Sequence, residues 1–280
     1  MPKFLGKLSE TDKAGICLLA YGPTSAGKTA SFITGIPKIL CINKESKDPR
    51  LVHSTLKSDY SDIVDYVEFD DFWDEMEYLN NLILKYEKGE RPYQTIAHDG
   101  LTFSMHSYKR TVEDARFIAN SLLKKETEKI GLHNILDLGK KEWADWNTLA
   151  GLMARETVLL NKLSKFGILV VSTAISMEYP RYNKAVSIAP ALLGKEFPQL
   201  IHGLFDSIGY VCQPFHINEK REIIVPKISF VNTSSESDFG QANTYLCRAN
   251  GLLMEAEIKY GPPKLDLTLL AKIIRGEFKV

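Results

Sequence analysis

"GPTSAGKT", residues 22–29, follows an apolar run near the start of the chain. The stretch matches the pattern G-x-x-x-x-G-K-[ST] in full, with Gly22, Gly27, Lys28 and Thr29 at the fixed positions. When a buried strand enters such a loop and a helix leaves it, successive backbone N–H groups surround an anion. The stretch therefore predicts a phosphate-binding loop at the end of a strand.

The residues of this loop have separate expected roles. The two glycines let the backbone approach phosphates closely, the lysine reaches the β- and γ-phosphates, and the threonine hydroxyl ligates Mg²⁺. The loop therefore predicts ATP and Mg²⁺ as cofactors. The residues expected to surround the nucleotide are Gly22, Pro23, Thr24, Ser25, Ala26, Gly27, Lys28 and Thr29.

Length and composition limit the class of protein. The 280 residues suffice for one large domain with a core, and 44% apolar and 25% charged residues are typical of a globular chain. Lys plus Arg and Asp plus Glu both total 35, so any nucleic-acid contact depends on a local basic patch. We expect no membrane contact, because no apolar run is long enough to span a bilayer and the N-terminus is too polar for a signal peptide. Scattered cysteines in apolar runs indicate buried thiols in a reducing cytoplasm; they are Cys17, Cys41, Cys212 and Cys247.

Strand and helix signals alternate over the first part of the chain. The runs expected to form strands are 15–22, 38–43, 65–70, 94–99 and 167–174. The segments expected to form helices are 28–35, 71–89 with an Asp cap, 104–130, 142–166 and a closing helix at 266–276. Strand signals dominate the later chain, at 207–215, 221–231 and 243–250.

This alternation predicts the fold class. Strands that alternate with helices form a mostly parallel sheet with helices on both faces, so we expect an α/β fold. The later strands predict an antiparallel C-terminal extension of the same sheet. Residues 131–145 and 176–198 are expected to be loops or insertions. No linker divides the chain, so residues 1–280 are expected to form a single domain.

Two carboxylates follow predicted strands and are candidates for chemistry. Asp99 ends the fourth strand, where a carboxylate would complete a Mg²⁺ site, whereas the neighbouring His98 fits a packing residue better than a ligand. Glu45 follows the second strand and would emerge at the same edge as the glycine loop, where it could activate water. Asp48 is the competing candidate for that role.

The chain resembles the RecA-like P-loop ATPases, and most closely their short phage form, the single-strand-annealing recombination ATPases. The matching pieces occur in the same order over nearly the whole chain. They are "GPTSAGKT", "ILCINKES", "YQTIAHDGLT", "GILVVSTA", "APALLGKEF" with "LFDSIGYV", and "TYLCRANG" before a final helix. The resemblance implies a RecA-like fold over residues 1–280 and a Mg²⁺-dependent ATPase that acts on single-stranded DNA in phage-type recombination or annealing, in the host cytoplasm if the chain is phage-encoded.

The resemblance also implies roles for individual residues. Glu45 matches the catalytic base, Asp99 matches the metal ligand, and residues 176–195 match the loop that contacts single-stranded DNA. Arg248 stands where a basic pair reaches the ATP of a neighbouring subunit, which implies a homo-oligomer. The chain departs from the family at the end of the fifth strand, where "AI" at 174–175 replaces a polar sensor of the γ-phosphate.

The stretch at 176–195 can also be interpreted without the family. Aromatic residues interleaved with basic ones suit base stacking and phosphate contact, although a packing loop is the alternative. The candidate DNA-binding residues are Tyr179, Arg181, Tyr182, Lys184 and Lys195. Two other functions stay open: a nucleoside or nucleotide kinase with a lid at 104–130, and a nucleotide-gated assembly protein with little turnover.

Overall fold

The computed structural model is an α/β structure, as the alternation of strand and helix signals predicts. It describes most of the chain. The described residues are 15–54, 63–69, 71–124, 143–180, 186–212, 216–217, 223–230, 244–249, 251–261 and 263–278.

Most strands of the central sheet run parallel. The sheet has the order β10-β7-β1-β5-β4-β2-β3, and every neighbouring pair in it is parallel except β10 with β7. Its strands are β1 (Ile16–Gly22), β2 (Ile39–Asn43), β3 (Val64–Glu68), β4 (Thr95–Asp99), β5 (Leu169–Pro180), β7 (Ser207–Val211) and β10 (Ile228–Ser229). The parallel strands place their carboxyl ends at one edge of the sheet, where β1 leads into the glycine loop.

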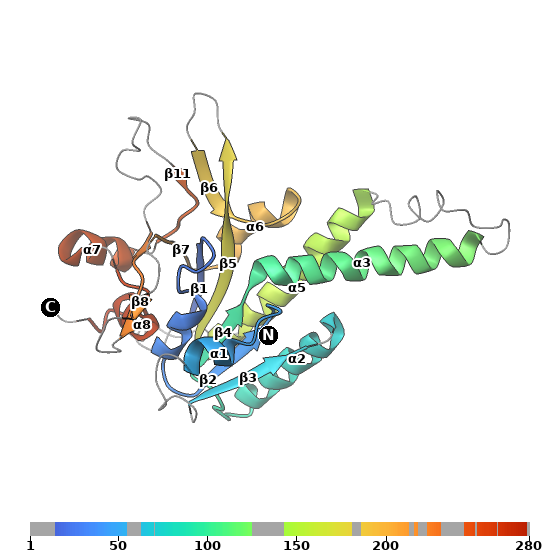
Figure 1. Cartoon of the computed structure of the whole chain (residues 1–280). Coiled ribbons are helices and arrows are strands. Elements are labelled where there is room, and N and C mark those ends of the chain that lie inside the picture. The colour runs from blue at the N-terminus through green and yellow to red at the C-terminus, as the bar shows by residue number, and fades with distance from the viewer. Residues whose placement is uncertain are drawn as a thin grey trace, which may run out of the picture.

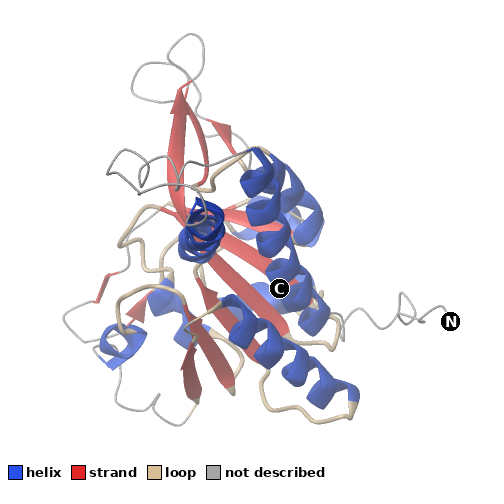
Figure 2. Cartoon of the chain, turned by 90° about the vertical axis from the view of Figure 1, so that its right-hand side faces the viewer, coloured by secondary structure: helices blue, strands red, loops and turns tan. Residues whose placement is uncertain are grey.

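Helices cover both faces of the sheet. Alternating residues of β1 enter two different buried clusters: Cys17 and Leu19 face one side, whereas Leu18 and Ala20 face the other. On the first face lie α2 (Phe72–Glu87), α3 (Leu101–Lys124), α5 (Trp143–Ser164) and α6 (Glu196–Leu204). On the second face lie the 3-10 helix η2 (Thr29–Thr34), α7 (Gly251–Tyr260) and α8 (Leu267–Ile274). Figure 2 shows the sheet between these helices.

Side-chain caps fix the ends of two predicted helices. The Asp71 carboxylate accepts hydrogen bonds from the backbone N–H groups of Trp73 and Asp74 at the start of α2. The Asp266 carboxylate accepts one from Leu269 at the start of α8. Both caps confirm helix starts that the sequence predicts.

The prediction of a loop or insertion at 176–198 needs correction where regular structure lies in that segment, whereas residues 191–195 are irregular as predicted. Strand β5 continues to Pro180 and pairs in antiparallel register with β6 (Val186–Pro190), so the two form a hairpin that extends beyond the central sheet (Figure 1). Prolines 180 and 190 favour a loop when only the sequence is considered. Both lie at strand ends, where proline is tolerated. Residues 196–198 begin α6.

Further predictions need correction at the C-terminal side. Strand β7 is parallel to β1 and therefore continues the parallel sheet, whereas β10 pairs with β7 in antiparallel register at its edge. The short β8 (His216–Ile217) and β9 (Ile223–Ile224) form a separate sheet, and β11 (Thr244–Tyr245) pairs in parallel with β6. Of the predicted 131–145 loop, residues 131–142 lie outside the described part and 143–145 belong to α5.

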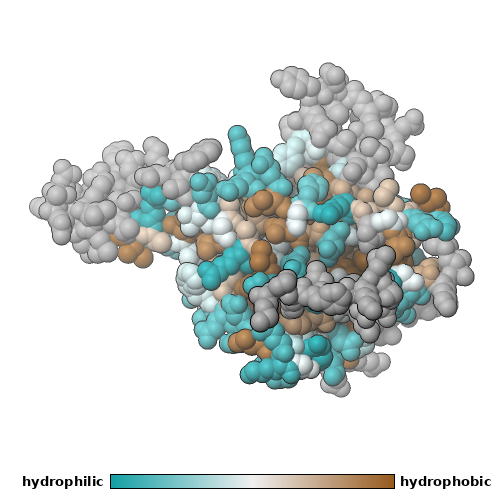
Figure 3. Space-filling view, turned by 180° about the vertical axis from the view of Figure 1, so that it is seen from behind, coloured by the Kyte–Doolittle hydropathy of each residue, from teal (hydrophilic) through white to brown (hydrophobic). Residues whose placement is uncertain are grey.

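The long helices α3 and α5 lie side by side and project from the body of the molecule (Figure 1). Arg116 on α3 donates to the Asp145 carboxylate on α5, which fastens the two helices together. No helix among the residues described here is long and apolar enough to cross a bilayer. The face seen from behind mixes hydrophilic and hydrophobic residues (Figure 3).

Candidate functional site

The glycine loop lies where the sequence predicts it, between β1 and η2. Gly22 packs so closely against β7 that a Cβ atom there would lie 2.7 Å from the Val211 carbonyl oxygen. Gly27 has φ +81°, in the left-handed region that glycine tolerates best, and Ser25 also has a positive φ of 62°. The backbone therefore turns sharply between strand and helix, as a loop that wraps an anion requires.

Lys28 turns back over the loop. Its ammonium donates hydrogen bonds of 2.9 Å to the Gly22 carbonyl and 2.7 Å to the Pro23 carbonyl. Burial lowers the pKa of Lys28 to about 8, against the opposing charges of Asp99 and Glu45. A cation that is held by two neutral carbonyls and is poorly solvated is favourably placed to gain an anionic partner.

Thr29 and Thr173 hold the two oxygens of the Asp99 carboxylate. The Thr29 hydroxyl donates to Oδ2 at 2.7 Å and the Thr173 hydroxyl donates to Oδ1 at 2.7 Å. Asp99 is almost fully buried at the end of β4. Hydroxyl and carboxylate oxygens are the ligands that Mg²⁺ prefers, so the donor set present here fits the predicted metal.

Glu45 leaves the sheet at the same edge as Asp99. In the register of β2 with β4, Asn43 lies beside Asp99, and the Asn43 amide donates to the Glu45 carbonyl at 2.9 Å. Burial and the charge of Asp99 raise the pKa of Glu45, while Lys28 opposes that shift. Glu45 is therefore electrostatically coupled to both Asp99 and Lys28.

Asp48, the competing candidate, is engaged elsewhere. Its carboxylate accepts from the Arg50 guanidinium at 2.7 Å and from the Arg50 backbone N–H at 2.9 Å. These hydrogen bonds lower the pKa of Asp48, which weakens it as a base. Because Glu45 is electrostatically coupled to Lys28 and Asp48 is held by Arg50, Glu45 is the better candidate for the base.

His53 is a site residue that the sequence analysis misses. It lies on the short helix α1 (Pro49–Ser54), is buried, and its Nε2 lies 2.8 Å from the Thr29 carbonyl oxygen. Nε2 must donate to that carbonyl, so Nδ1 accepts from the Tyr66 hydroxyl. A lone histidine in a six-residue helix carries no sequence signal for such a contact.

The predicted DNA-binding residues are only partly described. Arg181, Tyr182 and Lys184 lie outside the described residues. Tyr179 lies on the β5–β6 hairpin with 37% of its surface exposed, and Lys195 is the exposed residue that precedes α6. The structure therefore puts these two residues on separate elements.

Arg248 lies beside β7. Its backbone exchanges hydrogen bonds with Ile208, and its guanidinium donates to the His202 carbonyl. Arg248 is exposed, and its contacts with Ile208 and His202 lie away from the glycine loop of its own chain. Of the four cysteines, Cys212 is exposed and departs from the prediction that all are buried.

His98 belongs to a buried polar cluster that the sequence does not reveal. Its Nε2 lies 2.9 Å from Glu156 Oε1, which also accepts from Ser104 and Tyr108. The Tyr108 hydroxyl reaches Glu75 as well, and Glu75 forms an ion pair with Lys44. His98 is completely buried, as a packing residue would be, and its ring nitrogen contacts polar side chains.

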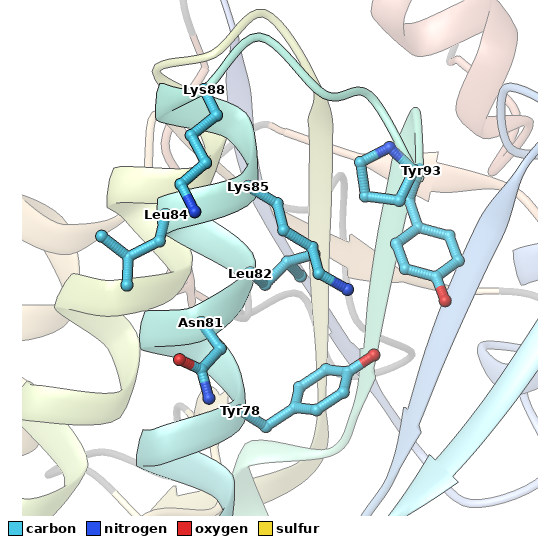
Figure 4. A pocket seen from close by; sticks show the side chains of 8 residues that line it. Tyr78, Asn81, Leu82, Leu84, Lys85, Lys88 and Tyr93 are labelled. Carbon is cyan, nitrogen blue, oxygen red and sulfur yellow. The ribbon is translucent and has the colours of Figure 1, made fainter.

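Two cavities lie outside the glycine loop. One, of about 460 Å³, is lined by α2 and by residues before β4, so it lies at the opposite edge of the sheet. There the side chains of Tyr78 and Lys85 extend on the same side as Tyr93 (Figure 4). The other, of about 320 Å³, adjoins the Glu45 loop and is lined by Asn43, by residues 46–50 and by β3.

Comparisons with known proteins identify no family for this chain. No family model matches the chain, and no curated protein matches its sequence. What the chain itself provides is a glycine loop, a lysine over it, and a threonine–aspartate pair beside it.

Proposed function

We propose that this chain is a Mg²⁺-dependent ATPase of the RecA-like P-loop class. The observation that carries the proposal is the Thr29–Asp99 hydrogen bond, which joins the last residue of the glycine loop to the end of β4. A P-loop ATPase needs the loop hydroxyl and a strand-end carboxylate together, because both act on the same metal ion.

Different residues would bind the nucleotide and hydrolyse it. The loop N–H groups and Lys28 would hold the phosphates, and Thr29 and Asp99 would hold Mg²⁺. When bound, Mg²⁺ would neutralise part of the phosphate charge. Thr173 fixes the second oxygen of Asp99 and so keeps the carboxylate turned toward Thr29. Glu45 would orient water or accept its proton, a role that its raised pKa supports.

The proposed substrate partner is single-stranded DNA, bound by the β5–β6 hairpin and its surroundings. Met177 and Tyr179 lie two residues apart on β5, and both side chains are exposed on the hairpin. An aromatic side chain in such a place can stack on a base. Phage-type recombination or annealing and a homo-oligomer with Arg248 at the subunit boundary belong to the same proposal.

A nucleotide-gated assembly protein with little turnover is the second candidate. The observation that favours it is the apolar pair Ala174 and Ile175, which lies beside Tyr21 and Gly22 in the register of β5 with β1. For the kinase alternative, residues 107–117 of the candidate lid lie within the helix α3, where Arg116 pairs with Asp145 of α5.

One experiment separates these candidates. Steady-state ATP hydrolysis is measured with and without single-stranded DNA, alongside a screen of phosphoryl acceptors. Release of inorganic phosphate that DNA accelerates supports the ATPase, whereas phosphate transfer to an acceptor would indicate a kinase. Tight ATP binding without turnover would indicate the assembly protein.

A further inference from the structure

Lys44 and Glu45 are the two residues that directly follow strand β2. Strand β2 ends at Asn43, but the Lys44 backbone N–H donates to the Asp99 carbonyl and so continues the pairing with β4 by one residue. Side chains alternate between faces along a strand. Lys44 therefore follows Leu40 and Ile42 toward α2, α3 and α5, and the next residue, Glu45, is electrostatically coupled to Lys28 of the glycine loop.

The Lys44 side chain is anchored inside the protein. Only 7% of it is exposed, and its ammonium forms an ion pair with the completely buried Glu75 of α2. The same ammonium lies over the rings of Tyr108, at 5.4 Å, and Phe69, at 5.9 Å. Ionic, hydrogen-bonding and cation–π contacts thus hold one cation from several directions.

The cluster around Lys44 brings two carboxylates together inside the protein. It contains two fully buried carboxylates, Glu75 and Glu156, which the Tyr108 hydroxyl bridges at 2.7 and 2.9 Å. Lys44 faces the first carboxylate and His98 faces the second. Because an unpaired charge in such a site is costly, Lys44 cannot swing out to solvent without leaving Glu75 uncompensated.

We propose that Lys44 is a positioning residue for Glu45, and that its ion pair with Glu75 fixes the point at which Glu45 leaves the sheet. Asn43 restrains the Glu45 backbone from the other side, through the hydrogen bond from its amide to the Glu45 carbonyl. The anchor acts through the chain and touches no nucleotide. The inference rests on the proposed ATPase function, because it assigns Lys44 a part in placing the water-activating carboxylate.

A metal ion is the competing explanation of the cluster. Ligand atoms of Glu75, His98 and Glu156 all lie within 4.8 Å of one another. However, Lys44 already occupies one oxygen of Glu75, and three donors already reach one oxygen of Glu156. One oxygen of each carboxylate therefore already has protein partners, which account for its position without a metal ion.

The test compares Lys44→Met with the double variant Lys44→Met/Glu75→Gln. Methionine keeps the length of the side chain and removes the ion pair. Because small misplacements of catalytic groups slow reactions strongly, kcat should fall about 10- to 100-fold. The dissociation constant for ATP should stay within about threefold, since Lys28 and the loop are untouched. The double variant removes the stranded Glu75 charge and should recover thermal stability without recovering kcat.

Three results would overturn the inference. The first is a Lys44→Met variant with wild-type kcat, and the second is a double variant whose kcat returns together with its stability. The third is a stoichiometric metal ion in the purified protein that Glu75→Gln releases. If Lys44→Met fails to fold, Glu75→Gln replaces it, because it keeps the shape of the side chain and removes the negative partner of the ion pair; an unchanged kcat there also contradicts the inference. Wild-type protein that does not hydrolyse ATP would instead overturn the proposed function, and this inference with it.

Discussion

Thr29 and Asp99 lie 70 residues apart in sequence, yet the Thr29 hydroxyl donates a 2.7 Å hydrogen bond to the Asp99 carboxylate. The contact joins the start of η2 to the end of β4 across the intervening strand β5, whose Thr173 holds the other carboxylate oxygen. Three separate elements thus converge on one carboxylate. Such convergence is typical of a site that holds a cation, because the oxygens of several elements must face one point.

The first prediction concerns Asp99. Asp99→Asn keeps the shape of the side chain and removes the negative charge, so we expect Mg²⁺-stimulated ATP hydrolysis to fall by at least about 100-fold. A titration of the hydrolysis rate with Mg²⁺ measures the effect. Asp48→Asn is the matched control, because Asp48 pairs with Arg50 and should not respond to Mg²⁺. Equal losses in the two variants would contradict a metal role for Asp99.

The second prediction concerns Glu45 as the group that activates water. Glu45→Gln should leave ATP affinity intact and lower kcat by about 10²–10⁴, the usual contribution of a general base. Because a base works in its ionised form and burial raises the pKa of Glu45, kcat of the wild type should fall as pH drops through that raised pKa. The residual activity of Glu45→Gln should lack this acid limb. An Asp48→Asn variant that slows turnover while Glu45→Gln does not would move the role to Asp48.

The third prediction concerns single-stranded DNA. An Arg181→Ala/Lys184→Ala variant should bind a labelled oligonucleotide more weakly and with a shallower salt dependence, since each phosphate contact contributes about −0.7 to the log–log slope on single strands. Lys85→Ala/Lys88→Ala is the matched control, because these lysines line the cavity at the opposite edge of the sheet. If the control loses affinity and the first variant does not, DNA binds at α2 and not at the hairpin.

The fourth prediction concerns Arg248 in an oligomer. Lys28→Ala and Arg248→Ala should each be inactive alone, because one lacks the phosphate-binding lysine and the other lacks the arginine supplied to a neighbour. Mixing the two should restore part of the activity, since some boundaries then combine an intact Lys28 with an intact Arg248. Hydrolysis measured against mixing ratio is the test. A mixture as inactive as its components would show that Arg248 does not act between subunits.

The sequence predicts the parts of the fold that depend on local patterns. Strands β1 to β5 follow from apolar runs, and α2 and α8 follow from the caps at Asp71 and Asp266, because a capping carboxylate is visible in sequence. The glycine loop is equally local. Its strand and its short helix lie where the pattern of the loop requires them.

Other features depend on contacts between distant segments and could not be predicted. The β5–β6 hairpin forms by pairing across a proline-containing stretch, and β7 joins β1 although nearly 200 residues separate them, as the Cys17–Asp206 hydrogen bond across 189 positions illustrates. His53 and the ion pair of Lys44 with Glu75 likewise join residues that share no motif. Their chemistry becomes apparent only when the chain is folded.

Calorimetric titration of Mg²⁺·ATP into the wild-type protein and into Lys28→Ala tests the central claim most directly. Lys28 is held over the glycine loop by the carbonyls of Gly22 and Pro23. The wild type should bind one equivalent of nucleotide, and Lys28→Ala should bind at least about 100-fold more weakly while its circular dichroism spectrum stays the same. A folded Lys28→Ala variant with wild-type affinity, or a wild type that binds no nucleotide, would contradict the account.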